Sequence, residues 1–495
     1  MEALKTIAQG TLRGTTSDGV SRFLGIPYAA APVGDLRFQA PAPAPAWSGV
    51  RDATSYGPTA PKPGYAAPFD GLLAEPAIAG PDCLNVNVWA PDQASGAPVM
   101  VWIHGGAFVN GSSAVPVYDG STFARDGIVF VSLNYRLGPI GFAYLPDAPA
   151  NRGLLDQVAA LEWVQRNIEV FGGDPGNVTI FGESAGGMSV TLLLSSPRTA
   201  GLFSKAIAQS GAIQAAAAPS DAALVTADFA ARLGVEPTAA GLAAVDTATI
   251  VATATEFGAE FTAGLDPQRW GATVVASAMP FIPVVDGDLL TEHPVAAFFG
   301  ATNSGIPLVT GTNLDEENFF LIPTGITGFI TDEIAPALAA RTGAGPDVFK
   351  LYQANRPDAT AGTVYSAFLT DAYFRLPALA VADARRAAGG RTWVYEFAQP
   401  DSRLGMGACH GLEVGYVFDN LYADGNDMLS AVELTDPEVR RDLAMAMHRT
   451  WTAFARTGDP GWPVYDESRP VMVYADSGGA VVNDPRGDER AIWTA

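Results

Sequence analysis

The sequence contains very little cysteine. Its 495 residues include only two cysteines, Cys83 and Cys409, which lie far apart along the chain. Two isolated cysteines cannot form a disulfide framework or supply a cysteine-based zinc site. A chain of this length buries a large core without such covalent or metal links. We therefore expect neither a disulfide framework nor a zinc cluster.

Basic residues are also scarce. Lysine and arginine together number 29 against 52 acidic residues, which gives a formal net charge of −23, and only four of the basic residues are lysines. Binding to nucleic acid depends largely on neutralising phosphate charge, which an acidic protein surface repels. The charge balance therefore argues against nucleic acid and anionic membrane surfaces as partners.

Long apolar runs are absent as well. A membrane-spanning helix needs about 18 consecutive apolar residues, and the longest candidate, residues 128–145, is interrupted by Asn134, Arg136, Gly138 and Pro139. The first residues, MEALKTIAQG, lack the basic start, apolar stretch and small-residue cleavage site of a signal peptide. We expect a soluble, cytoplasmic monomer with no membrane partner.

The most informative segment is VTIFGESAGGMSV at residues 178–190. A β-branched and aromatic run, a glycine-rich turn and an apolar helical run predict a strand, a sharp turn and a helix. In this context G-x-S-x-G is a nucleophile elbow, where Gly182 and Gly186 avoid Cβ clashes around a strained serine. Ser184 is therefore the candidate nucleophile. The alternative is an ordinary strand-to-helix connection, because a chain with 53 glycines can contain the pattern by chance.

Strand and helix patterns alternate around this segment. Helical spacing covers residues 153–171 and 438–456. This alternation predicts an α/β fold with a mostly parallel sheet and helices on both faces. An antiparallel hairpin is predicted within residues 4–29, and strands are predicted at 85–89, 99–103, 128–134, 205–209, 307–311 and 392–397.

Three further segments complete the predicted organisation. Residues 219–278 are rich in alanine and helical in pattern, which predicts a helical insertion over the sheet, and residues 331–388 contain further helical cap elements. Residues 32–81 are rich in proline, alanine and glycine and are interpreted as a surface-crossing segment, not an interdomain linker. We expect residues 1–495 to form a single domain.

The predicted strand at 99–103 ends in His104-Gly105-Gly106-Ala107-Phe108. Two glycines directly after a buried strand allow backbone N–H groups to turn toward a ligand, which is what an oxyanion hole requires. Gly105 and Gly106 are therefore candidates for this site. A plain turn at the end of a strand is the alternative.

A serine nucleophile needs a base, which is usually histidine, and the chain has only four. In this fold the catalytic order is serine, acid, histidine. His104 precedes Ser184, His293 precedes the best acid-bearing loop, and His448 lies inside a predicted helix. His410, in the loop GMGACHG, remains as the candidate base.

The acid should lie in a loop that follows a strand of the sheet. Asp315, Glu316 and Glu317 all follow the predicted strand at 307–311, and spacing alone does not choose among them. Three adjacent acids are also typical of a solvated turn. An acid that orients the base must be buried, so we expect its two neighbours to remain partly solvated.

Long motifs over nearly the whole chain resemble the type-B carboxylesterase family, which includes the cholinesterases and the bacterial para-nitrobenzyl esterases. The resemblance implies an α/β-hydrolase fold and ester hydrolysis through an acyl-enzyme. The motifs are FLGIPYAAAPVGDLRF, DCLNVNVW, PVMVWIHGGAFVNGS, NYRLGPIGF, NRGLLDQVAALEWVQRNIEVFGGDPGNVTIFGESAGG, QSGA, PVVDGDLL, GTNLDEENFF and ACHGLEVGYVF.

The resemblance also implies roles for single residues. The family's acid, the glutamate of a D-E-G segment, corresponds to Glu316, and its base corresponds to His410. The oxyanion donors correspond to the backbone N–H groups of Gly106, Ala107 and Ala185. A buried polar network around the base corresponds to Glu183, Ser210 and Glu413, and an internal ion pair corresponds to Arg136 and Asp156.

The chain departs from the family pattern at three positions. Glu317 stands where the family has the glycine of D-E-G. Pro81 stands where many members have a glutamate, so the family's ion pair to the arginine matching Arg37 is expected to be absent. Cys83 matches half of a loop disulfide in secreted relatives, but no upstream cysteine exists to pair with it, and Cys409 directly precedes the candidate base. We therefore expect both cysteines to be free thiols.

Together these observations predict a serine carboxylesterase with the triad Ser184, Glu316 and His410. Its substrate would be a small-molecule ester, and the mechanism requires no metal or organic cofactor. Two alternatives stay open. The chain could be a non-catalytic recognition module of the same fold, or it could hydrolyse amides, carbamates or lactones at the same site.

Overall fold

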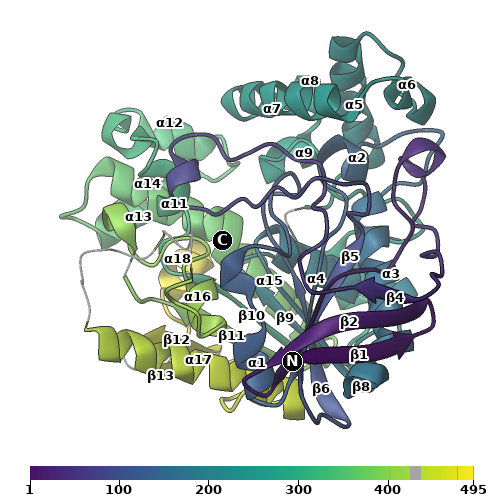
Figure 1. The fold of residues 1–495 in the computed structure, drawn as a ribbon. Helices are drawn as coiled ribbons and strands as arrows, with labels where there is room; N and C mark the ends of the chain where they lie inside the picture. Colours follow the sequence, from purple (N-terminus) through teal and green to yellow (C-terminus); the bar gives the residue numbers. More distant parts are fainter. Residues whose placement is uncertain (214, 401, 424–427, 429–435, 477, 494–495) are drawn as a thin grey trace.

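The computed structural model describes residues 1–213, 215–400, 402–423, 428, 436–476 and 478–493. Within these residues a single sheet of thirteen strands forms the centre of the molecule (Figure 1). The strands are β1 (Glu2–Ile7), β2 (Gly10–Ser17), β3 (Val20–Pro27), β4 (Val50–Asp52), β5 (Asn85–Pro91), β6 (Ala97–Ile103), β7 (Val129–Leu133), β8 (Gly173–Glu183), β9 (Lys205–Gln209), β10 (Leu308–Asn313), β11 (Thr392–Phe397), β12 (Pro470–Ala475) and β13 (Gly478–Asn483).

The middle of the sheet is parallel and its edges are antiparallel. The parallel strands follow the order β7-β6-β8-β9-β10-β11-β12, while β5, β3, β2 and β1 extend one edge and β13 closes the other. Parallel neighbours need crossover connections, which helices supply here. The carboxyl ends of the parallel strands therefore meet along one edge of the sheet, where loops from distant parts of the sequence converge.

Helices cover both faces of the sheet. Along β6, Val101 and Ile103 pack into one apolar cluster, whereas Met100 and Trp102 pack into the other, because alternate side chains of a strand point to opposite faces. The first cluster includes side chains of α3 (Arg152–Asn167), α4 (Ala185–Ser195), α10 (Pro294–Phe299) and α15 (Leu376–Ala387). The second includes side chains of α1 (Ser121–Arg125), α16 (Glu413–Val417) and α17 (Pro437–Thr457). The predicted α/β class is confirmed.

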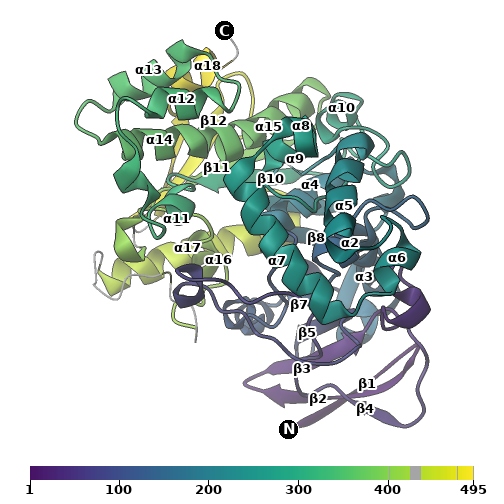
Figure 2. The same ribbon diagram turned by 90° about the horizontal axis from the view of Figure 1, so that it is seen from above.

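Two further groups of helices lie above the sheet in Figure 1, one on the right and one on the left. The right-hand group is α5 (Pro219–Leu233), α6 (Ala239–Ala243), α7 (Thr247–Gly264), α8 (Pro267–Trp270) and α9 (Ala272–Ser277). The left-hand group includes α11 (Asn318–Leu321), α12 (Ala335–Ala340), α13 (Pro346–Asn355) and α14 (Ala361–Thr370). The short helices α2 (Gly138–Phe142) and α18 (Gly487–Ile492) complete the fold. Figure 2 places the N-terminal strands and α18 at opposite ends of the molecule.

Several predicted elements have the predicted bounds, and others were not predicted. β9 and β11 coincide with the predicted strands at 205–209 and 392–397. The C-terminal hairpin β12–β13 and the helix α18 carry no prediction. Residues 32–81 contain only the short strand β4 and two short 3₁₀ turns, consistent with a surface-crossing segment. No helix in the described part of the chain is long and apolar enough to cross a membrane.

Candidate active site

The candidate nucleophile lies at the sharp turn between β8 and α4. Ser184 has φ 56° and ψ −124°, a backbone conformation that L-residues rarely adopt. Its N–H donates to the carbonyl of Gln209 at 2.9 Å, and its own carbonyl accepts from Met188 at 2.8 Å. A Cβ atom at Gly186 would lie 2.0 Å from the carbonyl oxygen of Ile103. The elbow can therefore pack against β6 only because this position is glycine.

The loop after β6 runs alongside Ser184. A Cβ atom at Gly105 would lie 3.1 Å from the Cβ of Ser184. The next three residues, Gly106, Ala107 and Phe108, all have positive φ values of 108°, 53° and 60°. In the described part of the chain, the N–H groups of Gly106, Ala107 and Ala185 donate no hydrogen bond to a protein acceptor. These three donors are thus available to a ligand oxygen.

The candidate acid and base are in direct contact. The Nδ1 of His410 lies 2.5 Å from Oε2 of Glu316, whose side chain is fully buried. The other oxygen of Glu316 accepts from the N–H of Asn313 at 2.7 Å. Because an ionised carboxylate only accepts hydrogen bonds, Nδ1 carries the proton and Nε2 is left as the basic nitrogen. Of the three adjacent acids, only Glu316 is placed to orient the base.

The neighbours of Glu316 have different environments. Asp315 is partly exposed and fastens the histidine loop, since its Oδ2 accepts from the N–H of Ala408 at 3.0 Å. Glu317 is only 7% exposed, and its N–H donates to Oγ1 of Thr370 at 3.1 Å. The expectation that both neighbours are partly solvated is wrong for Glu317, because α14 covers that side of the turn. Burial raises the pKa of Glu317 to about 8.

The second nitrogen of His410 faces the elbow. Nε2 lies 3.2 Å from Oε1 of Glu183, the residue before the candidate nucleophile. This oxygen accepts no hydrogen bond within the described residues. Glu183 therefore acts on His410 through its charge. The described residues also show no hydrogen bond between Ser184 and His410. Catalytic hydrogen bonds are often long without substrate and tighten when it binds.

Carboxylates and aromatic rings surround the imidazole. The ring centroids of Phe374 and Phe320 lie 4.9 and 5.3 Å from that of His410. Burial alone would lower the pKa of His410, but the carboxylates of Glu183 and Glu316 outweigh it and raise the pKa to about 9. Burial also raises the pKa of Glu183 to about 8. The neighbouring carboxylates therefore stabilise the protonated form of His410.

A hydrogen-bond network behind the acid includes residues that the sequence analysis missed. Asn313 Nδ2 donates to Oε2 of Glu413 at 2.7 Å and to the carbonyl of Cys409 at 2.7 Å. Gln209 Nε2 donates to Oε1 of Glu413 at 3.2 Å, and its own Oε1 accepts from the indole of Trp451 at 3.0 Å. Asn313 and Gln209 lie within quoted motifs, GTNLDEENFF and QSGA, and their positions at strand ends were the available signal.

The structure does not bring the Ser210 side chain into this network. Its buried hydroxyl has no hydrogen-bond partner within the described residues. Ser210 does contribute through its backbone, because its N–H donates to the carbonyl of Gly311 at 2.9 Å. This bond ties the end of β9 to β10, the strand that leads to Glu316.

The other three histidines have structural contacts. His104 is buried, contacts the carbonyl of Gly105 through Nδ1 at 2.8 Å and stacks on Tyr135, and burial lowers its pKa to about 3. His293 precedes α10 and caps it, and His448 lies within α17 beside the carbonyl of Val417. These contacts agree with the choice of His410 by elimination.

Comparison with known proteins identifies the family. The family model described as Carboxylesterase family matches residues 2–477. A para-nitrobenzyl esterase of Bacillus subtilis (strain 168) is 38% identical, over 98% of this chain and 97% of the relative. The chain belongs to the carboxylesterase family. A phenmedipham hydrolase of Pseudarthrobacter oxydans is 33% identical, over 98% of each chain.

Solved structures give the same result. The carboxylesterase of Geobacillus stearothermophilus superposes with a TM-score of 0.83 at 35% identity, covering 99% of each chain. A structure of PNB esterase has a TM-score of 0.84 at 35% identity, covering 100% of this chain and 99% of the other. The fold is therefore the α/β-hydrolase fold, and the protein is a serine carboxylesterase that hydrolyses carboxylic esters.

Two of the expected structural features of this carboxylesterase are present. Arg136 and Asp156 form a buried ion pair through two hydrogen bonds, with Nε and Nη2 donating at 2.8 and 2.7 Å. Cys83 and Cys409 are both free and buried. Arg37 makes no ion pair within the described residues and donates instead to the carbonyl of Val245 at 2.7 Å, between α6 and α7.

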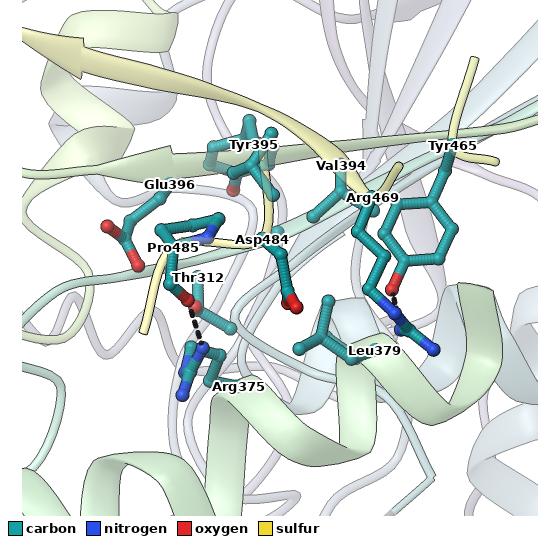
Figure 3. A pocket seen from close by; sticks show the side chains of 13 residues that line it. Thr312, Arg375, Leu379, Val394, Tyr395, Glu396, Tyr465, Arg469, Asp484 and Pro485 are labelled. Atoms are coloured by element: carbon teal, nitrogen blue, oxygen red, sulfur yellow. Dashed lines mark hydrogen bonds between the residues drawn. The ribbon is translucent and has the colours of Figure 1, made fainter. Parts of the chain in front are cut away.

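A small, mostly apolar cavity lies between α15 and the strands β10 and β11 of this carboxylesterase. Figure 3 shows Arg375 and Arg469 among its lining residues. Arg375 is paired with Asp371, and Arg469 with Asp383. The lining carboxylates are paired as well, Glu396 with Arg486 and Asp484 with Arg490, so among the described lining residues each of these four charged side chains already has a partner. Within the described residues no group of His, Cys, Asp or Glu is arranged to hold a metal ion.

Proposed function

We propose that this carboxylesterase hydrolyses small esters with Ser184 as nucleophile, His410 as general base and acid, and Glu316 as the carboxylate that orients His410. The observation that carries the proposal is the 2.5 Å contact between Glu316 and Nδ1 of His410 beside the elbow. This contact leaves Nε2 to act on the serine proton.

The first half-reaction would form the acyl-enzyme. Nε2 of His410 takes the proton of Ser184 as its oxygen attacks the ester carbonyl carbon. The carbonyl oxygen becomes negatively charged and is stabilised by the N–H groups of Gly106, Ala107 and Ala185. Collapse of this intermediate breaks the bond to the alcohol, which leaves with the proton from His410. Water then repeats the sequence on the acyl-enzyme and releases the acid.

Covalent labelling tests this assignment. An aryl phosphonate carries a phosphoryl centre that reacts with an activated serine and cannot be turned over by water quickly. We expect one equivalent to inactivate hydrolysis of a para-nitrobenzyl ester and to modify the peptide that contains Ser184. The Ser184→Ala variant should show neither label nor turnover. Stoichiometric inactivation with the label on another residue would contradict the proposal.

The substrate class is proposed from relatives. Similarity to a para-nitrobenzyl esterase and to a phenmedipham hydrolase supports small aromatic substrates, and the phenylalanine rings beside His410 offer apolar contacts. Rates on matched ester, carbamate, amide and lactone substrates would establish the preferred bond. We expect the ester to be hydrolysed fastest, because an alkoxide leaves more readily than an amide nitrogen.

The remaining properties are also proposals. We propose that the chain is a single-domain monomer and acts in the cytoplasm of a bacterium. One continuous sheet and two free buried thiols support this view, since free thiols persist in reducing compartments. Sedimentation of the full-length protein at several concentrations tests the monomer, and fractionation of the source cell tests the compartment.

A further inference from the structure

Two charged side chains of the surface-crossing segment are buried against the oxyanion loop. Lys62, one of only four lysines, and Glu75 both lie between β4 and β5. Lys62 Nζ and Glu75 Oε1 form an ion pair whose side chains are only 2% and 9% exposed. We call this pair the Lys62–Glu75 clamp. Burying two charges is costly, so stability alone does not explain why this ion pair is buried.

The clamp holds both backbone polar groups of Gly111. Lys62 Nζ donates to the carbonyl of Gly111 at 2.9 Å, and the N–H of Gly111 donates to Oε2 and Oε1 of Glu75 at 3.2 and 3.3 Å. Asn110 Nδ2 donates to Oε2 of Glu75 at 3.3 Å and to the carbonyl of Pro63 at 2.9 Å. All these bonds join the same short stretch of the loop after β6 to the surface-crossing segment.

Gly111 and Asn110 are tightly connected to the oxyanion donors. The carbonyl of Gly106 accepts from the N–H groups of Val109 and Asn110 at 2.9 and 2.8 Å, which closes a turn around Ala107. A Cβ atom at Gly106 would lie 2.3 Å from the carbonyl oxygen of Asn110, and one at Gly111 would lie 2.3 Å from that of Gly105. The two ends of the loop therefore pack directly against each other, and a shift of Asn110 or Gly111 would also displace Gly105 and Gly106.

The loop needs such external support because its conformation is strained. Ala107 and Phe108 have φ values of 53° and 60°, and each such residue costs on the order of 1 kcal/mol. Strained backbone persists only when surrounding contacts determine it. Cys83 is free, so no disulfide constrains the surface-crossing segment, and the clamp is a buried connection between this segment and the loop.

We propose that the Lys62–Glu75 clamp positions the backbone N–H groups of Gly106 and Ala107 for the oxyanion, so that Lys62 and Glu75 are positioning residues for transition-state stabilisation. This inference rests on the proposed function, because it assumes that these N–H groups bind the oxyanion. Its consequence is specific. Loss of the clamp should weaken binding of the transition state far more than binding of the substrate.

The test compares Lys62→Met and Glu75→Gln with Arg51→Met. Arg51 pairs with Asp82 at 3.2 Å beside the same segment, and within the described residues it forms no ion pair or side-chain hydrogen bond with the oxyanion loop. Removing one oxyanion donor costs about 10²–10³ in kcat, and a displaced donor should cost less. We expect kcat for a para-nitrobenzyl ester to fall about 10- to 100-fold in the clamp variants, with KM within about threefold of wild type. Arg51→Met should keep both values.

A tetrahedral boronic acid provides the second readout, because its boron-bound oxygen occupies the position of the oxyanion. Its affinity should fall by the same factor as kcat, while that of the product alcohol stays unchanged. Glu75→Gln should be less impaired than Lys62→Met, since an amide oxygen can still accept from Gly111. If Lys62→Met does not fold, the ratio of boronic acid to alcohol affinity in Glu75→Gln decides.

The possible failures are distinguishable. If wild type neither hydrolyses the ester nor binds the boronic acid, the proposed function is wrong. If wild type does both and the folded clamp variants keep wild-type kcat and boronic acid affinity, the proposed function stands and this inference is overturned. Equal losses in the clamp variants and in Arg51→Met would also overturn it, since the effect would then belong to the whole segment.

Discussion

At the scale of single residues, the candidate site places one histidine among several carboxyl groups. Glu183 and Glu316 face its two nitrogens, and Glu413 lies behind Glu316 through Asn313. Burial raises the pKa of Glu413 to about 7, and Glu316 adds to the effect. The protons of such a cluster are shared, so a pH profile reports the cluster as a unit.

The pH dependence of hydrolysis should reflect this cluster. Only neutral imidazole accepts the serine proton, and a raised pKa moves the appearance of that form to higher pH. We expect kcat/KM to increase with pH with a midpoint above the ordinary histidine value of about 6.5. Glu183→Gln removes a charge that stabilises imidazolium, so its midpoint should be lower than that of wild type. Glu162→Gln, on the surface, should leave the midpoint unchanged. A wild-type midpoint at or below about 6.5 would contradict the electrostatic argument.

The three adjacent acids should differ in their effect on turnover. Glu316→Gln keeps the shape but removes the charge that stabilises imidazolium and permits the wrong tautomer. Removing the equivalent charge in a serine protease costs about 10⁴ in kcat, so we expect a loss of at least about 10² here. Asp315→Asn should mainly reduce the folded fraction, because Asp315 fastens the histidine loop. Rates must therefore be divided by the concentration of sites that react with the phosphonate. A near-normal Glu316→Gln with an inactive Asp315→Asn would reassign the acid.

Glu317 should affect stability in a pH-dependent way. Its folded-state pKa of about 8 is above the ordinary value of 4.5, so the unfolded chain loses this proton first. Stability is therefore lost progressively as the pH rises from about 4.5 to 8. Glu317→Gln removes this loss, and its Tm should exceed that of wild type by more at pH 8.5 than at pH 5.

An exposed glutamate serves as the control for this prediction. The side chain of Glu467 is 93% exposed, and Glu467→Gln should change Tm by a similar small amount at both pH values. If Glu317→Gln instead lowered Tm most at high pH, Glu317 would be a stabilising carboxylate with a partner, and its burial would have been interpreted wrongly.

At the scale of elements, the elbow depends on close contact between α4 and β6. Gly186→Ala places a methyl group 2.0 Å from the carbonyl oxygen of Ile103, where only backbone could move to relieve it. We expect a loss of at least about 2 kcal/mol in stability, with hydrolysis lost in the folded fraction. Gly258→Ala in α7 is the matched control, since nothing lies within 4 Å of its added Cβ. That variant should gain up to about 1 kcal/mol. Similar Tm changes in both variants would show that the elbow can accommodate a methyl group at Gly186.

Elements with a local signal could be predicted from the sequence. β9 and β11 are buried strands in which most residues are apolar, and the glycines at the elbow follow from its geometry. The hairpin β12–β13 was missed because β12 begins at Pro470 and β13 begins with two glycines, while the outer strand is exposed and weakly apolar. Its stability comes from pairing with β11, which no local pattern encodes.

The residues of the candidate site also fall into those with a local sequence signal and those without one. Ser184 and His410 were identifiable from a motif and from chain order. The choice of Glu316 over its neighbours needed either the family resemblance or the contact with Nδ1, since three adjacent residues point in different directions only after folding. Asn313 and Gln209 were missed because their partners lie about a hundred or more residues away in sequence. The burial of Glu317 was missed for the same reason, because it depends on α14, which is distant in sequence.

At the scale of the whole molecule, non-covalent packing alone must hold the described chain together. Both thiols are buried, and burial raises the pKa of Cys83 to about 12 and the pKa of Cys409 further. A reactive thiol requires the thiolate form, so both should react slowly in the native protein. The sheet, with apolar clusters on both faces, supplies the stability that disulfides supply in small secreted domains.

Thiol titration tests this view directly. In denaturant without reductant we expect two reactive thiols per chain, and in native buffer we expect almost none over the same time. The Tm should be the same with and without dithiothreitol, because reduction removes no bond from the native state. Cys83→Ser and Cys409→Ser should each lower the denatured count by one and serve as controls. A count of zero in denaturant would require a bond between Cys83 and Cys409. Since Cys409 immediately precedes His410, that bond would displace the base from Glu316, so the count also tests the geometry on which the proposed function rests.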